Sequence, residues 1–169
     1  MRLNDKICGK LTGRVRVYQY GVLEPIIEEH NEITDAAEEV ISGLLARDPD
    51  NYLIDTIAVG KGGDCEIDPP HNDTGARVAP DPGETEIRSL VEALPIQQTL
   101  RTGNEFTFSV LARPEQAIST DINELALLTR NGTMVAHYVT PLGLLGRAEK
   151  KPKSTYFWII EWTLRFTLA

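Results

Sequence analysis

The chain of 169 residues has little of what several functional classes require. It contains two cysteines, Cys8 and Cys65, which are too few for a disulfide framework. It has no surplus of positive charge, because 25 acidic residues outnumber 17 basic ones and the formal net charge is −8. A surface for nucleic acid or for an anionic membrane needs clustered lysine and arginine. We therefore expect neither nucleic acid nor a membrane as a partner.

Long hydrophobic runs are also missing from the sequence. No stretch approaches the roughly 18 apolar residues of a membrane span. Residues 1–9 are short and charged, without the apolar centre of a secretory signal. We expect synthesis in a reducing cytoplasm, where Cys8 and Cys65 remain free thiols. The alternative is a bridge within the chain or between subunits.

No catalytic constellation is evident. The chain has three histidines, His30, His71 and His137, but no G-x-S-x-G turn that would hold a nucleophile. The glycine-rich segment 60–63 lacks the Lys-Ser/Thr ending and the following helix of a phosphate loop. His137 lies in an alternating segment, which is typical of a half-buried structural residue. The sequence therefore predicts a protein that is not an enzyme and has no cofactor.

One acidic segment contains donors that metal ions use. Its spacing does not match a calcium loop, and it lacks the second Cys or His pair of a zinc site. We expect a solvated loop and no metal. The donors considered are Asp64, Cys65, Glu66, Asp68, His71 and Asp73.

The closing stretch, from Tyr156 onward, is the most regular feature of the sequence. Its side chains alternate strictly, which places successive residues on opposite faces of a strand. One face is apolar throughout and carries both tryptophans, whereas the other is apolar first and polar later. We expect a long, centrally placed strand whose first end is covered on both faces. The apolar face consists of Tyr156, Trp158, Ile160, Trp162, Leu164, Phe166 and Leu168.

Shorter segments bounded by turn residues predict about seven further strands. Asn131-Gly132 is a strong hairpin signal between the last two of them. The expected ranges are 11–20, 22–30, 53–59, 88–100, 105–112, 122–128 and 134–139.

One helix is expected over residues 34–47, because apolar residues recur there at i, i+3, i+4, i+7 and i+8. Thr34 or Asp35 is the expected cap, and Pro49 is expected to stop the helix. Short strands with intervening turns favour an antiparallel β-sandwich, jelly-roll-like, with the helix over an end or a face. The whole chain, 1–169, is expected to be a single domain.

Two long loops interrupt the expected strands, a polar one at about 60–86 and a second at about 141–153. The second contains Leu142, Leu144 and Leu145, followed by Arg147. Apolar residues exposed at a loop often mark a contact surface. The alternative is that these leucines fold back onto the core.

The order of several segments resembles a class of bacteriophage virion proteins. These are the N-terminal attachment domains of phage tail-collar fibre proteins and small free-standing relatives. Ala126 departs from the glycine typical of that position, and no fibre shaft follows the last strand. The segments that carry the resemblance are residues 31–37, 57–62, 86–88, 122–128, 131–136, 140–141 and 162–166.

The resemblance implies a structural protein of the virion, made in the host cytoplasm, that binds other virion proteins. An adaptor in the tail, baseplate or fibre attachment is favoured, with capsid decoration as the alternative. It also implies a closed homo-oligomer, often a trimer. A bridge between subunits involving Cys65 would then form only after lysis, outside the reducing cytoplasm. A stand-alone carbohydrate- or small-molecule-binding sandwich is a third reading.

Overall fold

The computed structural model describes residues 9–60, 80–88, 90–113, 122, 124–139 and 157–168. Strands dominate these residues, and the two helices are short. In chain order the elements are β1 (Gly9–Gln19), β2 (Ile27–Ile33), α1 (Ala37–Leu45), α2 (Pro49–Tyr52), β3 (Ile54–Gly60), β4 (Leu90–Pro95), β5 (Gln98–Thr102), β6 (Glu105–Ala112), β7 (Glu124–Thr129), β8 (Met134–Val139) and β9 (Trp158–Leu168).

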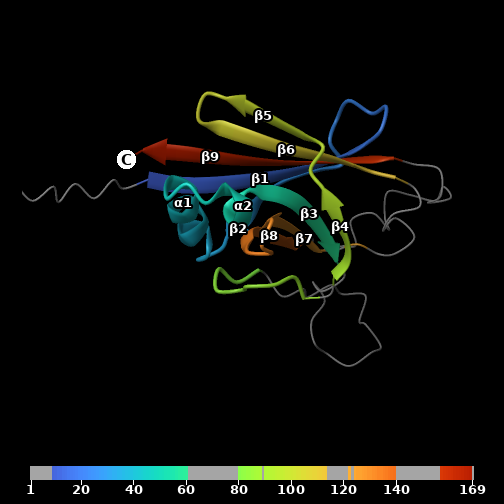
Figure 1. Ribbon diagram of the computed structural model, residues 1–169. Coiled ribbons are helices and arrows are strands. Elements are labelled where there is room, and N and C mark those ends of the chain that lie inside the picture. The colour runs from blue at the N-terminus through green and yellow to red at the C-terminus, as the bar shows by residue number, and fades with distance from the viewer. Residues whose placement is uncertain are drawn as a thin grey trace, which may run out of the picture.

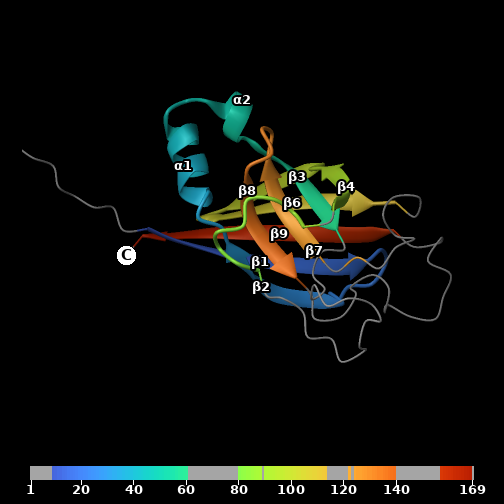
Figure 2. The same cartoon turned by 90° about the horizontal axis from the view of Figure 1, so that it is seen from below.

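The nine described strands form one antiparallel sheet in the order β4-β3-β7-β8-β2-β1-β9-β6-β5. The sheet is curled, so that β1, β9, β6 and β5 lie over β2, β8, β7 and β3 (Figure 1). The helices lie at one end of the curl, beside the start of β1 (Figures 1 and 2). The expected mostly-β class is confirmed, with nine strands where about eight were expected.

Two connections join the halves of the curled sheet. β2 pairs with β1 through residues 27–31 and then with β8 through Glu32 and Ile33. At the other side, β4 leads into β5 through Ile96 and Gln97. The N–H of Ile96 donates to Asp55 O on β3, and the N–H of Gln97 donates to Ser109 O on β6. The nine described strands therefore form one continuous sheet. The expected two-sheet sandwich of jelly-roll type is not confirmed.

The closing strand β9 lies inside the sheet, because it pairs with β1 on one side and with β6 on the other. Trp162 stands between Val15 of β1 and Phe108 of β6 in this register, and its side chain is 0% exposed. The prediction of a long interior strand with one buried face is confirmed. The other face is less covered than expected, since Phe157 is 39% exposed.

The hydrophobic core fills the inside of the curl. β1, β6 and β9 contribute one wall, β3, β7 and β8 contribute the facing wall, and α1 closes an end with Ala37 and Val40. Burying a large aliphatic or aromatic side chain stabilises the fold by about 1.5–3 kcal/mol. The largest fully buried apolar side chains are Trp162, Ile57, Leu94, Ile122, Leu125, Leu127, Met134 and Ile160.

Helix α1 is shorter than the expected 34–47 and has a different start. Ala36 occupies the cap position and makes no side-chain cap bond. Thr34 is instead committed to the sheet, because its hydroxyl donates to Met134 O, and the N–H of Asp35 donates to Pro82 O. The helix ends before Arg47, which adopts a left-handed φ of 65°.

Pro49 begins the second helix, α2, and does not simply stop the first. Proline suits this position because its missing N–H would have no partner in the first turn. α2 brings Tyr52 against Gly43 of α1, where an added Cβ would collide with the Tyr52 ring. The close contact between the helices therefore explains a glycine that costs α1 roughly 1 kcal/mol of helix stability.

Two other expected strands differ from the structure. The segment expected at 22–30 is a loop as far as Ile26, and β2 begins at Ile27. The single bent strand expected over 88–100 is two strands, β4 and β5, at opposite edges of the sheet order. By contrast, the Asn131-Gly132 hairpin is confirmed, with Gly132 at a φ of 88° and β7 paired to β8.

In the part of the chain that the structure describes, neither helix reaches the length and apolar character needed to cross a membrane.

Candidate contact surfaces and a buried histidine cluster

The contact residues expected from sequence fall where the structure gives no description. Leu142, Leu144, Leu145 and Arg147 lie outside the described residues, and so do both cysteines, Cys8 and Cys65. The acidic segment 64–73, which is expected to bind no metal, also lies outside the described residues. The described residues nevertheless present three features that bear on function: a buried cluster, an apolar loop and a polar hollow.

The buried cluster is centred on His137 of β8. Its Nδ1 lies 2.7 Å from Glu84 Oε2, and its Nε2 lies 2.9 Å from Glu124 Oε1. His137 and Glu124 are both 0% exposed, so the histidine expected to be half-buried is fully enclosed. We call Glu84, His137 and Glu124 the clasp, because they attach a segment that crosses the outside of the sheet, to which Glu84 belongs, to β7 and β8.

That segment, residues 80–88, is named the strap, and it runs across β8 on the outer side of the curl (Figures 1 and 2). Arg88 reinforces it by donating from Nε to Glu84 Oε1 at 2.6 Å and from its backbone N–H to Glu124 Oε1 at 2.8 Å. Beneath the strap, Ile87 packs with Ala126 and Met134. The strap is therefore fixed to the sheet by charged hydrogen bonds and by a small apolar contact.

The geometry of the clasp constrains its protons. A neutral imidazole donates from one nitrogen only, whereas both nitrogens of His137 face carboxylate oxygens. Two satisfied contacts need either an imidazolium ring or one protonated carboxyl group.

The pKa of Glu84 shows the effect of its neighbours. Burial raises this pKa, but the Arg88 side chain, the N–H of Asp81 and His137 lower it more, so that it lies below its ordinary value of 4.5. Glu84 is thus held as a carboxylate. Through Glu84 and Arg88 the cluster ties the strap to β7 and β8, which is the geometry of a structural anchor.

The apolar loop joins β1 to β2 and projects from the end of the β1–β9 pair (Figure 1). Leu23 at its tip is 97% exposed. The Tyr20 and Phe157 rings lie 6.0 Å apart at the base of the loop, and the N–H of Tyr20 donates to Phe157 O. We call this surface the tip patch. It consists of Tyr20, Val22, Leu23, Ile26 and Phe157.

The polar hollow lies on the outer face of β2, β1, β9 and β6 and has a volume of about 150 Å³. Arginine and threonine side chains alternate around it, and Phe, Tyr and Trp are absent from its lining. The polar side chains that line the hollow are those of Thr12, Arg14, His30, Glu105, Thr163 and Arg165.

Sequence reasoning missed all three features, for different reasons. The tip patch had a local signal, because Val22 and Leu23 follow Gly21 where a turn normally carries polar residues. The clasp had none, since Glu84 and His137 are 53 positions apart. The hollow depends on strand register, which places β1 beside β9.

Within the described residues, no group of three or more His, Cys, Asp and Glu side chains is arranged to hold a metal ion. Comparison of the chain with protein-family models, with curated proteins and with solved structures finds no match.

Proposed function

We propose that this protein is a non-enzymatic structural component of a bacteriophage virion, acting as an adaptor in the tail, the baseplate or the attachment of a fibre. The observation that supports a role in protein contacts is the tip patch, in which five apolar side chains are 39–97% exposed on one loop and its neighbour. Exposed apolar patches of this kind mark protein–protein contacts. The virion itself is inferred from the segment order set out above.

The patch is suited to docking because its support is rigid. β1 and β9 pair in register over eleven residues, and the loop extends from the end of that pair. A loop held by a rigid scaffold loses less conformational freedom on binding than a free segment. Full burial of a leucine side chain is worth about 1.5–3 kcal/mol, so Leu23 is the expected centre of the contact.

The partner is a second virion protein, and the chain itself is proposed to form a closed homo-oligomer, with a trimer as the first expectation. Light scattering over a range of protein concentrations tests self-association. Capsid decoration is the competing location in the particle. Gold labelling of intact particles separates the two, because label on the tail supports the adaptor and label over the head supports decoration.

The direct test is the composition of purified particles. Particles from the strain that carries the gene are banded in a density gradient and examined by mass spectrometry. We expect the protein at a fixed stoichiometry that survives a high-salt wash, because an apolar contact is not screened by salt. Its absence from banded particles would overturn the proposal.

The role of the tip patch is tested by co-sedimentation of added protein with particles that lack it. Leu23→Ser is expected to weaken binding by about tenfold or more, corresponding to loss of at least ~1.4 kcal/mol of apolar burial. Leu45→Ser is the matched control, because Leu45 is also an exposed leucine, 80% accessible, but lies on α1. Equal binding by both variants would contradict the assignment of the patch.

A further inference from the structure

The hollow is built by strand register on the outer face of the sheet. Arg14 of β1 lies opposite Thr163 of β9, and Thr12 lies opposite Arg165. Arg14 and Arg165 are therefore diagonal neighbours on one face, with Cα atoms roughly 7–8 Å apart. Long side chains at such positions can reach each other, and two like charges there are unfavourable unless anionic groups lie beside them.

The carboxylates nearby leave these two guanidinium groups incompletely matched. Glu28 accepts from Arg14 Nη1 and also from Nε and Nη2 of Arg16, all at one oxygen, so two arginines share one carboxylate. The Arg16 hydrogen bond lowers the pKa of Glu28 and keeps it ionised. Arg165 Nε is 3.8 Å from Glu105 Oε1, which is too long for a hydrogen bond.

Each guanidinium has five N–H donors, so Arg14 and Arg165 retain donors beyond these contacts. Glu161 stands opposite Arg16 in the next row of the sheet and does not line the hollow. Among the lining side chains there are two guanidinium groups and one carboxylate. The lining itself therefore carries one surplus positive charge, and the Glu28 carboxylate that Arg14 shares with Arg16 lies beside it.

A threonine hydroxyl and a histidine ring complete the lining. Thr163 is only 7% exposed, and its Oγ1 lies 3.0 Å from Thr107 Oγ1, so one threonine can donate to the other and leave a proton for a ligand. His30 Nδ1 faces the carbonyl oxygen of Gly13 at 3.4 Å. A carbonyl only accepts, so this nitrogen carries the proton in the neutral ring. The second nitrogen of His30 then carries a lone pair and no proton, so the neutral ring donates no hydrogen bond to a ligand in the hollow.

We propose that this hollow is a binding site for a carboxylate group, held between Arg14 and Arg165 over the Thr163 hydroxyl. The planar fork of a guanidinium matches the two oxygens of a carboxylate. One surplus charge in the lining suits a monoanion better than a phosphate dianion. A sugar ring usually stacks on Trp, Tyr or Phe, and the lining contains none of these. The site is independent of any role in a virion.

The test is an NMR titration of the full chain with sodium acetate, with sodium chloride replaced to keep ionic strength constant. We expect saturable shifts in the millimolar range, confined to backbone amides near residues 12–14, 30 and 163–165. Phosphate is expected to bind more weakly. Linear shifts that match those of chloride would overturn the proposal.

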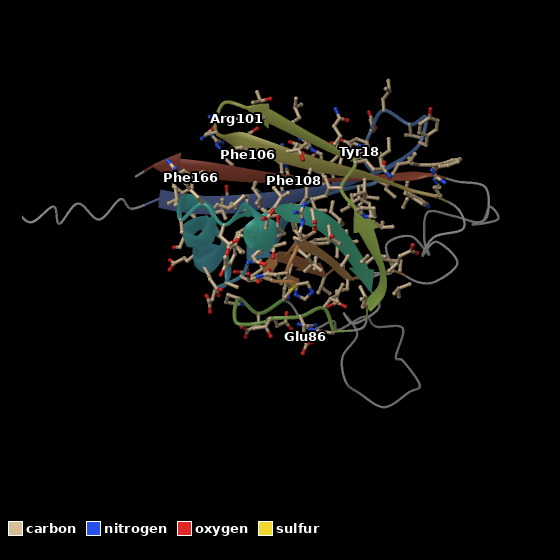
Figure 3. The ribbon with its side chains drawn as sticks, viewed as in Figure 1. Tyr18, Glu86, Arg101, Phe106, Phe108 and Phe166 are labelled. Carbon is tan, nitrogen blue, oxygen red and sulfur yellow. The ribbon has the colours of Figure 1, made fainter. Side chains whose placement is uncertain are left out.

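Variants separate the site from general charge effects. Arg165→Gln and Thr163→Val are each expected to weaken acetate binding about threefold to fivefold, as for one exposed ion pair or one hydrogen bond. Arg101→Gln is the matched control, because Arg101 stacks on Phe106 at the β5–β6 hairpin and does not line the hollow (Figure 3). If Arg165→Gln and Thr163→Val bind acetate as tightly as the parent and the Arg101→Gln control do, the proposal is wrong.

The source of the carboxylate is distinguished by a second ligand, a blocked tripeptide with one central glutamate. Binding of the peptide at least as tight as that of acetate assigns the site to an acidic side chain of a partner protein. Binding of acetate with exclusion of the peptide assigns it to a free small acid. Failure of both ligands overturns the site, and none of these results depends on whether the chain is found in particles.

Discussion

The clasp makes a prediction about how the strap is held to the sheet. Glu84→Gln keeps the size and shape of the side chain and removes its charge. In the parent, Glu84 accepts two bonds from Arg88, at 2.6 and 2.5 Å, accepts the N–H of Asp81 at 3.2 Å, and contacts His137. A hydrogen bond to a charged group is worth about 1.5–3 kcal/mol, and bonds within one network are not additive. We expect a loss of about 2 kcal/mol near pH 7.

The dependence on pH follows from the pKa of Glu84, which lies below its ordinary value of 4.5 in the folded protein. A group with a lowered pKa contributes stability that is present above the unfolded value and is lost as the pH falls through the folded value. The parent should therefore lose this contribution below about pH 4.5, whereas Glu84→Gln has none to lose. The difference in unfolding free energy between the two proteins should shrink as the pH falls.

Two measurements check this prediction. Urea denaturation at a series of pH values from 7 to 3 gives the difference in unfolding free energy. Hydrogen exchange at the Asp35 amide reports the strap itself, because that N–H donates to Pro82 O of the strap at 2.8 Å. If the strap detaches locally, Asp35 loses protection even when global unfolding is unchanged.

The matched control is Glu86→Gln, the same chemical change on an exposed residue of the same strap (Figure 3). It should leave both the denaturation midpoint and the Asp35 exchange rate unaltered. A Glu84→Gln protein as stable as the parent at pH 7, or a difference that stays constant to pH 3, would refute the reasoning.

Other parts of the chain yield further predictions. Trp162→Ala should cost about 3–5 kcal/mol in denaturation experiments. Trp162→Phe should cost much less, because the indole N–H finds no acceptor within the described residues and its removal offsets lost bulk. Gly43→Ala should destabilise by about 1–3 kcal/mol, although alanine favours helices, because its Cβ would collide with Tyr52; a raised melting temperature would contradict this. Non-reducing gels of particles should show whether Cys65 bridges subunits; monomers with both thiols open to alkylation would remove that idea.

Elements with an uninterrupted side-chain pattern could be predicted from sequence. The ranges 105–112 and 134–139 match β6 and β8 residue for residue. β6 alternates between less and more buried positions, and β8 follows the Asn131-Gly132 turn. β9 was located as an interior strand because its apolar face continues across the whole pairing with β1 and β6. In these cases the local pattern and the tertiary environment agree.

The side-chain pattern of the sequence did not predict the structure where contacts with a neighbouring element determine it, as at the ends of α1. The apolar periodicity of α1 includes Leu44 and Leu45, yet these are 40% and 80% exposed, whereas Ala37 and Val40 nearer the start of the helix are buried. Thr34 has the chemistry of a helix cap, but β8 offers it the carbonyl oxygen of Met134. Local propensity therefore placed the helix, and tertiary contacts set its ends.

The site features depend even more on distant contacts. Nothing near Glu124 in the sequence indicates a partner at His137, because the pairing arises only when β7 and β8 form a hairpin. The surplus charge of the hollow likewise requires β1 to lie beside β9 in one register, and a shift of one residue would turn Arg165 toward the core. Register, and not composition, produces both features.

Register also relates the two proposed contact surfaces to each other. Tyr20 directly follows β1 and Phe157 directly precedes β9, so the tip patch continues the strand pair whose outer face carries the hollow. From Gly13 to Tyr20 the strand advances seven residues, or roughly 23 Å at 3.3 Å per residue. A partner with a footprint shorter than this distance contacts one surface and leaves the other free. A partner that engages both must therefore lie along β1 and β9 and present an apolar pocket at one end and a carboxylate at the other.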